Sequence, residues 1–65
     1  MSTPKERVQL EAEALSTKLE DLNKILEQVQ PKFISNYQWA MLQVQQVHMQ
    51  SYLGILNKRL ANWEG

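Results

Sequence analysis

The sequence predicts an all-α fold, an antiparallel two-helix hairpin that assembles into a homo-oligomeric helical bundle. Two long stretches repeat apolar residues at alternating spacings of three and four, which places those residues on one side of an α-helix. The β-branched runs typical of strands are absent, and the 65 residues contain only two glycines and two prolines for turns. We expect one domain over residues 1–65, with helices at about 4–29 and 36–63 joined by a connection at about 30–35.

The first predicted helix has a well-marked start and a clear stop signal. Thr3 suits the N-cap, Pro4 suits the first helical position, and Glu6 completes a capping box. The apolar seam that follows consists of Val8, Ala12, Leu15, Leu19, Leu22, Leu26 and Val29. Pro31 disfavours the helical conformation for Gln30, so we expect this helix to end near residue 29 or 30.

The connection and the second helix repeat this organisation. We expect Phe33 and Ile34 to cover the closed end of the hairpin, and Ser35 offers a second N-cap with Gln38 three residues later. The second seam consists of Trp39, Leu42, Gln46, Met49, Leu53, Leu56, Leu60 and Trp63. Gln46 is its one polar member, and we expect its side chain to hydrogen-bond across the helix pair rather than to contact a ligand.

A further row on the second helix predicts contact with other copies of the chain. It consists of Met41, Gln45, His48, Tyr52 and Ile55. No Asp, Glu, Lys or Arg occurs between Lys32 and Lys58, although a solvent-facing helix normally carries charges of both signs. We expect this row to form an oligomer interface together with Gly54, which either permits close helix approach or is simply tolerated.

Composition excludes several classes of protein. Seven basic residues balance seven acidic ones, so the surplus of positive charge needed for sequence-specific nucleic-acid binding is missing. With no cysteine and one histidine, the chain offers neither a disulfide framework nor the usual metal sites, and it has no cofactor motif. No enzyme signature occurs, and His48 has no carboxylate on its helix face, so we expect no catalytic residues. No signal peptide or membrane-spanning segment is expected.

The open end of the predicted hairpin gathers side chains with binding chemistry. The candidate ligand-binding residues are Lys5, Arg7, Tyr52, Asn57, Lys58, Arg59, Asn62 and Trp63. Arginine and lysine grip phosphates, asparagine reads base edges, and tryptophan or tyrosine stacks on a base. A structural alternative stays open. In that alternative the cations complement the helix macrodipole, the tryptophan caps the seam, and Lys5 or Arg7 pairs with Glu11 or Glu64.

Both helices carry residues that resemble a known group of proteins. These are Glu6-Arg7-Val8, Glu13, Leu15, Lys18-Leu19-Glu20, Leu22 and Ile25, followed by Met49, Tyr52, Ile55-Leu56, Arg59-Leu60 and Trp63. They resemble the short helical-hairpin proteins of crAss-like and other tailed phages. The architecture is also similar to that of the phage anti-CBASS and anti-Thoeris sponges, which form oligomers and sequester cyclic nucleotide or ADP-ribose immune messengers.

The resemblance implies a non-enzymatic phage anti-defence protein in the cytoplasm of the host cell. Its expected partners are further copies of itself and a small nucleotide ligand, with no membrane and no sequence-specific nucleic acid. The arginines and lysines would grip phosphates, as the residues themselves indicate. The alternative is an oligomeric structural or adaptor protein whose second helix binds a partner helix.

Overall fold

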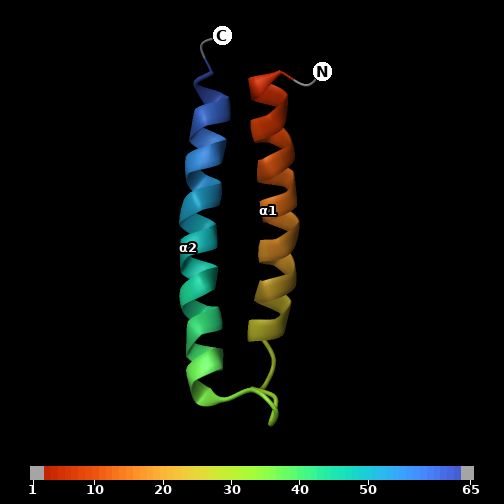
Figure 1. The fold of residues 1–65 in the computed structure, drawn as a ribbon, viewed down its shortest axis with the longest axis vertical. Helices are drawn as coiled ribbons and strands as arrows, with labels where there is room; N and C mark the ends of the chain where they lie inside the picture. Colours follow the sequence, from red (N-terminus) through yellow and green to blue (C-terminus); the bar gives the residue numbers. More distant parts are fainter. Residues whose placement is uncertain (1–2, 64–65) are drawn as a thin grey trace.

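The computed structural model describes residues 3–63, which form two long antiparallel helices (Figure 1). Helix α1 spans Pro4–Leu26 and helix α2 spans Asn36–Ala61. The chain turns back between them, so the start of α1 and the end of α2 lie at the same end of the hairpin (Figure 1). The described residues form these two helices and no strand, which confirms the predicted all-α hairpin. Its assembly into an oligomer stays a prediction.

Both helices begin at the predicted N-caps. The hydroxyl oxygen of Thr3 accepts a hydrogen bond from the backbone amide of Glu6 at 3.2 Å, and Pro4 follows the cap. The hydroxyl oxygen of Ser35 accepts one from the backbone amide of Gln38 at 3.1 Å. Each cap residue has an extended backbone and supplies a partner to an amide that its helix leaves unpaired.

The two predicted seams face one another and form the core. The buried residues are Val8, Ala12, Leu19, Leu22 and Leu56. Leu56 is fully buried and packs with Val8 and Ala12 near the open end. The partly buried side chains around this cluster are Leu15, Leu53, Leu60 and Trp63. The core is therefore a single strip between two helices.

Helix α1 ends at Leu26, about three residues before the predicted end. The amide of Glu27 donates to the carbonyl oxygen of Asn23, and that of Gln28 donates to the carbonyl oxygen of Ile25, which tightens the last turn. A helix that continued to Pro31 would press the proline ring against the carbonyl group of Glu27. Pro31 therefore prevents the helix from continuing through residue 31, and the tightened last turn ends it earlier, at Leu26.

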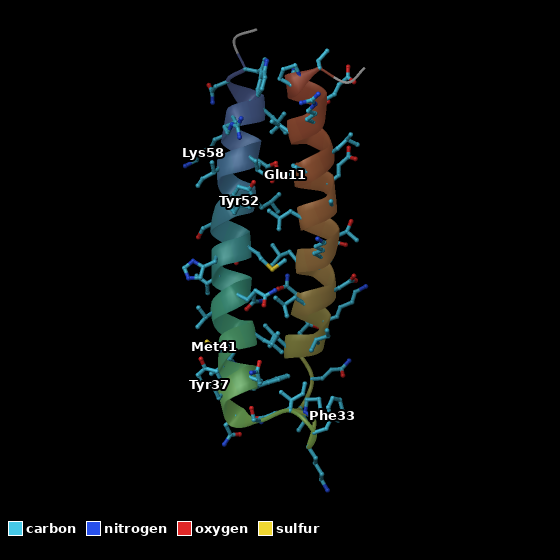
Figure 2. All side chains as sticks on the ribbon, in the orientation of Figure 1. Glu11, Phe33, Tyr37, Met41, Tyr52 and Lys58 are labelled. Carbon is cyan, nitrogen blue, oxygen red and sulfur yellow. The ribbon has the colours of Figure 1, made fainter. Side chains whose placement is uncertain are left out.

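Two apolar side chains that were expected to be covered near the closed end are exposed instead. Val29 was expected in the first seam, but it lies in the connection and is 92% exposed. Phe33 and Ile34 were expected to cover the closed end together, but Phe33 is 88% exposed (Figure 2), and only Ile34 is partly buried. Instead, the side-chain amide of Gln30 donates to the carbonyl oxygen of Ile34 and to the side-chain oxygen of Asn36, both at 2.9 Å. Polar contacts therefore shape this connection.

The hairpin is long and thin. It measures 49 × 20 × 16 Å and has a radius of gyration of 15.0 Å, whereas a compact chain of this length would have about 11 Å. Five residues among positions 3–63 are buried, so the core is small for the length of the helices. Of the described helices, neither combines the length with the apolar character needed to cross a membrane.

Candidate ligand-binding site

A contact between a tyrosine and a glutamate links the helices on one face of the hairpin. The hydroxyl of Tyr52 in α2 donates a hydrogen bond to the Oε1 atom of Glu11 in α1 (Figure 2). This hydrogen bond raises the pKa of the Tyr52 phenol above its ordinary value, and desolvation and the negative charge of Glu11 act in the same direction. The positive charge of Arg59 acts in the opposite direction.

An arginine lies on the same helix side as each member of the Tyr52–Glu11 pair. Arg59 follows Tyr52 by seven positions, which is two helical turns, so both lie on the same side of α2. Arg7 precedes Glu11 by four positions and shares its side of α1. We call Arg7, Glu11, Tyr52 and Arg59 the arginine–tyrosine face. It combines two forked guanidinium groups with an aromatic ring that is 43% exposed.

Three other predicted ligand residues have different surroundings. Lys58 projects from the side of α2 that faces away from α1 (Figure 2). The side-chain amide of Asn62 donates to the carbonyl oxygen of Lys58 at 2.9 Å, which closes the end of α2 at Ala61, two residues before the predicted end. Trp63 packs against the buried cluster at the open end, as the structural alternative expected. Glu64, named there as an ion-pair partner, lies outside the described residues.

The opposite face of the hairpin carries two open hollows with mainly polar linings. The hollow near the open end has a volume of about 380 Å³ and is lined by Gln9, Ala12, Glu13, Ser16, Leu53, Asn57 and Leu60. The hollow near the connection has a volume of about 370 Å³ and is lined by Asn23, Leu26, Glu27, Gln43, Gln46 and Gln50. We call this surface the amide face.

Two predicted ligand residues lie on the side of the amide face, away from the arginine–tyrosine face. Asn57 follows Tyr52 by five positions, which is a rotation of about 140° around α2. Lys5 precedes Gln9 by four positions and therefore shares the side of α1 that lines the hollow. The eight candidates thus do not form one cluster within a single chain.

Gln46 makes the contact that the sequence predicted. Its side-chain amide donates a hydrogen bond to the Oδ1 atom of Asn23, and both residues are partly buried. The expectation of a glutamine bonded across the helix pair is confirmed. The same two residues line one hollow of the amide face.

The predicted oligomer interface lies on the surface of the chain. Met41, Tyr52 and Ile55 are 40%, 43% and 54% exposed, although each has a large apolar side chain. Gln45 and His48 are also exposed, and the Gln45 amide lies 3.7 Å from the sulfur of Met49.

Gly54, which was predicted to belong to the interface, has open space beside its Cα atom. A Cβ atom placed on Gly54 would have no contact within 4 Å beyond its own helix backbone and chain neighbours. Nothing in the described part of the chain therefore requires glycine at this position.

Comparison with known proteins identifies the family. A family model described as Sequestin matches residues 2–62, which include both helices and the whole arginine–tyrosine face. The chain belongs to the Sequestin family. The family name denotes sequestration of a ligand, and hence binding rather than catalysis. Neither a curated protein nor a solved structure matches the chain.

Sequence reasoning missed two residues of this Sequestin-family chain. Glu11 appeared there only as an ion-pair partner for a cation, and Asn23 was not singled out. A signal for both was available. Folding the chain back about the centre of the predicted connection brings Glu11 to within one turn of the level of Tyr52, and Asn23 to about one turn from the level of Gln46.

Proposed function

We propose that the chain is a phage anti-defence protein that binds and sequesters a small nucleotide immune signal without cleaving it. The ligand would be a cyclic nucleotide or an ADP-ribose derivative, held by a homo-oligomer in the cytoplasm of the host cell. Membership of the Sequestin family carries this proposal, because the family name denotes the withholding of a ligand. The arginine–tyrosine face supplies chemistry that fits a nucleotide.

Arg7 and Arg59 are the proposed phosphate-binding residues. A guanidinium group binds a phosphate through two parallel hydrogen bonds and keeps its charge at every physiological pH. The two arginines belong to different helices, so the packing of the hairpin sets their relative position. This arrangement requires no net positive charge on the chain, which carries equal numbers of basic and acidic residues.

Tyr52 is the proposed stacking residue. Its hydrogen bond to Glu11 restricts the orientation of the ring, while the exposed part of the ring remains available to a base. The carboxylate of Glu11 would keep phosphate away from the tyrosine hydroxyl, so a phosphate would be held by the arginines rather than by that hydroxyl. Base and phosphate would therefore occupy neighbouring positions on one face.

The other candidates are proposed as secondary contacts, reached across copies of the chain. Lys5, Asn57 and Lys58 lie away from the arginine–tyrosine face, and Asn62 and Trp63 already make contacts within the hairpin. Symmetric association can place side chains of one copy beside the binding face of the next. In such an assembly the lysines would add attraction for phosphate, and the asparagines would read base edges.

Calorimetry tests the proposal. The protein is titrated with cyclic dinucleotides, cyclic oligonucleotides and ADP-ribose derivatives, and the ligand is recovered after denaturation. We expect saturable binding of at least one class, recovery of the ligand intact, and a loss of tenfold or more in affinity for Arg59→Ala and Tyr52→Ala, about 1.4 kcal/mol for each factor of ten. The matched control is Lys24→Ala in the last turn of α1, which should bind normally.

Three results would contradict the proposed sequestration of a nucleotide. These are no saturable heat with any ligand class, normal affinity in both Arg59→Ala and Tyr52→Ala, and recovery of a cleaved ligand. The uncharged surface of α2, where Val44 and Val47 are 45% and 60% exposed, favours a structural or adaptor role as the second candidate. Stoichiometric capture of a protein partner, without nucleotide binding, would support that role.

A further inference from the structure

The outer side of α2 carries a second heptad seam. It consists of Tyr37, Ala40, Val44, Val47, Ser51, Gly54 and Lys58, spaced alternately by three and four residues. All seven are exposed, and Tyr37 and Lys58 project away from α1 (Figure 2). A seam with this spacing forms one stripe along a helix, and here the stripe lies opposite the one that packs on α1.

Helix α1 has no comparable outer stripe. The residues opposite its own seam include Glu6, Thr17, Asp21 and Lys24, and all four are exposed. Charges of both signs at successive turns are typical of a solvated surface. The uncharged outer side of α2 therefore distinguishes it from its neighbour and favours burial against another helix.

The outer seam consists mainly of small side chains, which leave room for a second helix. Its five central positions are alanine, valine, valine, serine and glycine, which allow two helix backbones to approach closely. Among residues 3–63, nothing beyond the adjacent residues and backbone of its own helix lies within 4 Å of a Cβ atom placed on Gly54, so the missing side chain makes room for no contact there. An interior helical glycine disfavours the helix, and close approach of a second helix would explain its presence.

The accessible surface of the chain exceeds that of a compact monomer by about the area that one partner would bury. The accessible surface is 5289 Å², whereas a compact monomer of this mass would expose about 4300 Å². The excess is of the order of 1000 Å², close to the roughly 800 Å² that each partner buries in a standard interface. A second copy of the same hairpin would supply a matching stripe without any other protein.

We propose that α2 packs antiparallel against α2 of a second copy along this outer seam, with the two α1 helices on the outside. Centring the pair on Val47 brings Ala40 opposite Gly54 of the second copy, where the backbones approach most closely. A parallel pair would place the two Lys58 ammonium groups together, whereas the antiparallel pair brings each beside the ring of Tyr37, a cation–π geometry.

This inference specifies the self-association contained in the proposed function and rests on it. Of the predicted interface, Gly54 would lie within the α2–α2 contact and Met41, His48 and Ile55 would border it, whereas Gln45 would lie outside it. Tyr52 faces Glu11 and lies outside the contact. The arginine–tyrosine face would therefore remain open to a ligand on both copies of the dimer.

Single cysteines test the register, because the natural chain contains none. Under mild oxidation we expect Val47→Cys to form a disulfide-linked dimer, and a mixture of Ala40→Cys and Gly54→Cys chains to form the mixed dimer. Lys58→Cys should not cross-link, since its two copies would lie about 30 Å apart. Efficient cross-linking of Lys58→Cys, or none of Val47→Cys, would overturn the antiparallel seam.

Substitutions then test the contact itself. We expect Val47→Glu and Gly54→Leu each to weaken the dimer by tenfold or more in sedimentation, with helicity followed by circular dichroism. Leucine favours helix more than glycine does, so loss of the dimer in Gly54→Leu would not reflect helix propensity. Thr17→Glu on the outer side of α1 is the control and should dimerise normally. An unaffected dimer in both seam variants would refute the seam.

The same samples distinguish this inference from the proposed function. Calorimetry with the nucleotide panel reports ligand binding independently of the cross-links. An oligomer that binds nucleotide but cross-links at other positions would overturn the seam alone. A wild-type chain that is monomeric in sedimentation would overturn the self-association on which the seam rests.

Discussion

The side-chain amide of Gln46 donates a hydrogen bond to the side-chain oxygen of Asn23, joining the two helices in an otherwise largely apolar seam. Asn23 lies three residues before the end of α1 and Gln46 lies ten residues after the start of α2, so the contact sets how far one helix is displaced along the other. A polar member of a heptad seam fixes register in this way at some cost in stability.

A double-mutant cycle on this pair should show coupling. We expect Asn23→Ala and Gln46→Ala to be non-additive, with a coupling free energy of about 1 kcal/mol, because each single change leaves one partner without its hydrogen bond. Urea denaturation of the four proteins at one concentration measures it. Additivity within about 0.3 kcal/mol would show that the contact contributes nothing to stability.

Leu56→Ala should be the most damaging single change in the core. Leu56 is fully buried against Val8 and Ala12, and its truncation leaves a cavity in a core that has few other residues. We expect a loss of about 2–5 kcal/mol in the free energy of unfolding, measured by denaturation. The control is Leu10→Ala, at a residue 60% exposed, which should change stability by less than about 0.5 kcal/mol. Equal effects of the two changes would contradict the placement of the core.

Alkaline titration should show the raised pKa of the Tyr52 phenol. The raised pKa of Tyr52 means that the folded protein favours the protonated phenol. Its contribution to stability is therefore present below the ordinary value of 10.0 and is lost as pH rises through the higher folded value. Tyr52→Phe should flatten the fall in stability in this range. Ultraviolet titration in which Tyr52 ionises at or below its ordinary pKa would contradict the contact with Glu11.

At the connection, replacing the exposed Phe33 should cost less folding stability than replacing Gln30. Phe33 and Val29 are almost fully exposed, while Gln30 makes the hydrogen bonds that shape the turn. We expect Phe33→Ser to shift the free energy of unfolding by no more than about 0.5 kcal/mol, and Gln30→Ala to cost about 1 kcal/mol. Thermal melts of both variants provide the comparison. A larger loss for Phe33→Ser would show that the ring is covered in the folded protein.

The sequence predicted the helices and their inner seams well, because capping residues and heptad spacing are local signals. Thr3 and Ser35 cap the helices as expected, and Leu56 lies at the centre of the core. The end of α1 was less predictable. The last turn is tightened by the hydrogen bond from the amide of Gln28 to the carbonyl oxygen of Ile25, and apolar spacing does not show such a turn.

The candidate site was only partly predictable. Proximity at one end of the hairpin is a poor guide to a shared face, because neighbouring residues on a helix are separated by about 100°. Asn57, Lys58 and Arg59 therefore point in three directions although they are adjacent in the chain. The pairing of Tyr52 with Glu11 additionally required the rotation of each helix about its axis, which only the packed hairpin provides.

Sedimentation equilibrium of the wild-type chain, combined with circular dichroism, tests the central claim that this hairpin is stable only in association with further copies of itself. At micromolar concentration we expect helical protein with a mass that is a multiple of the 7.6 kDa chain, and loss of helicity as dilution dissociates it. A fully helical species of 7.6 kDa that persists on dilution would contradict it.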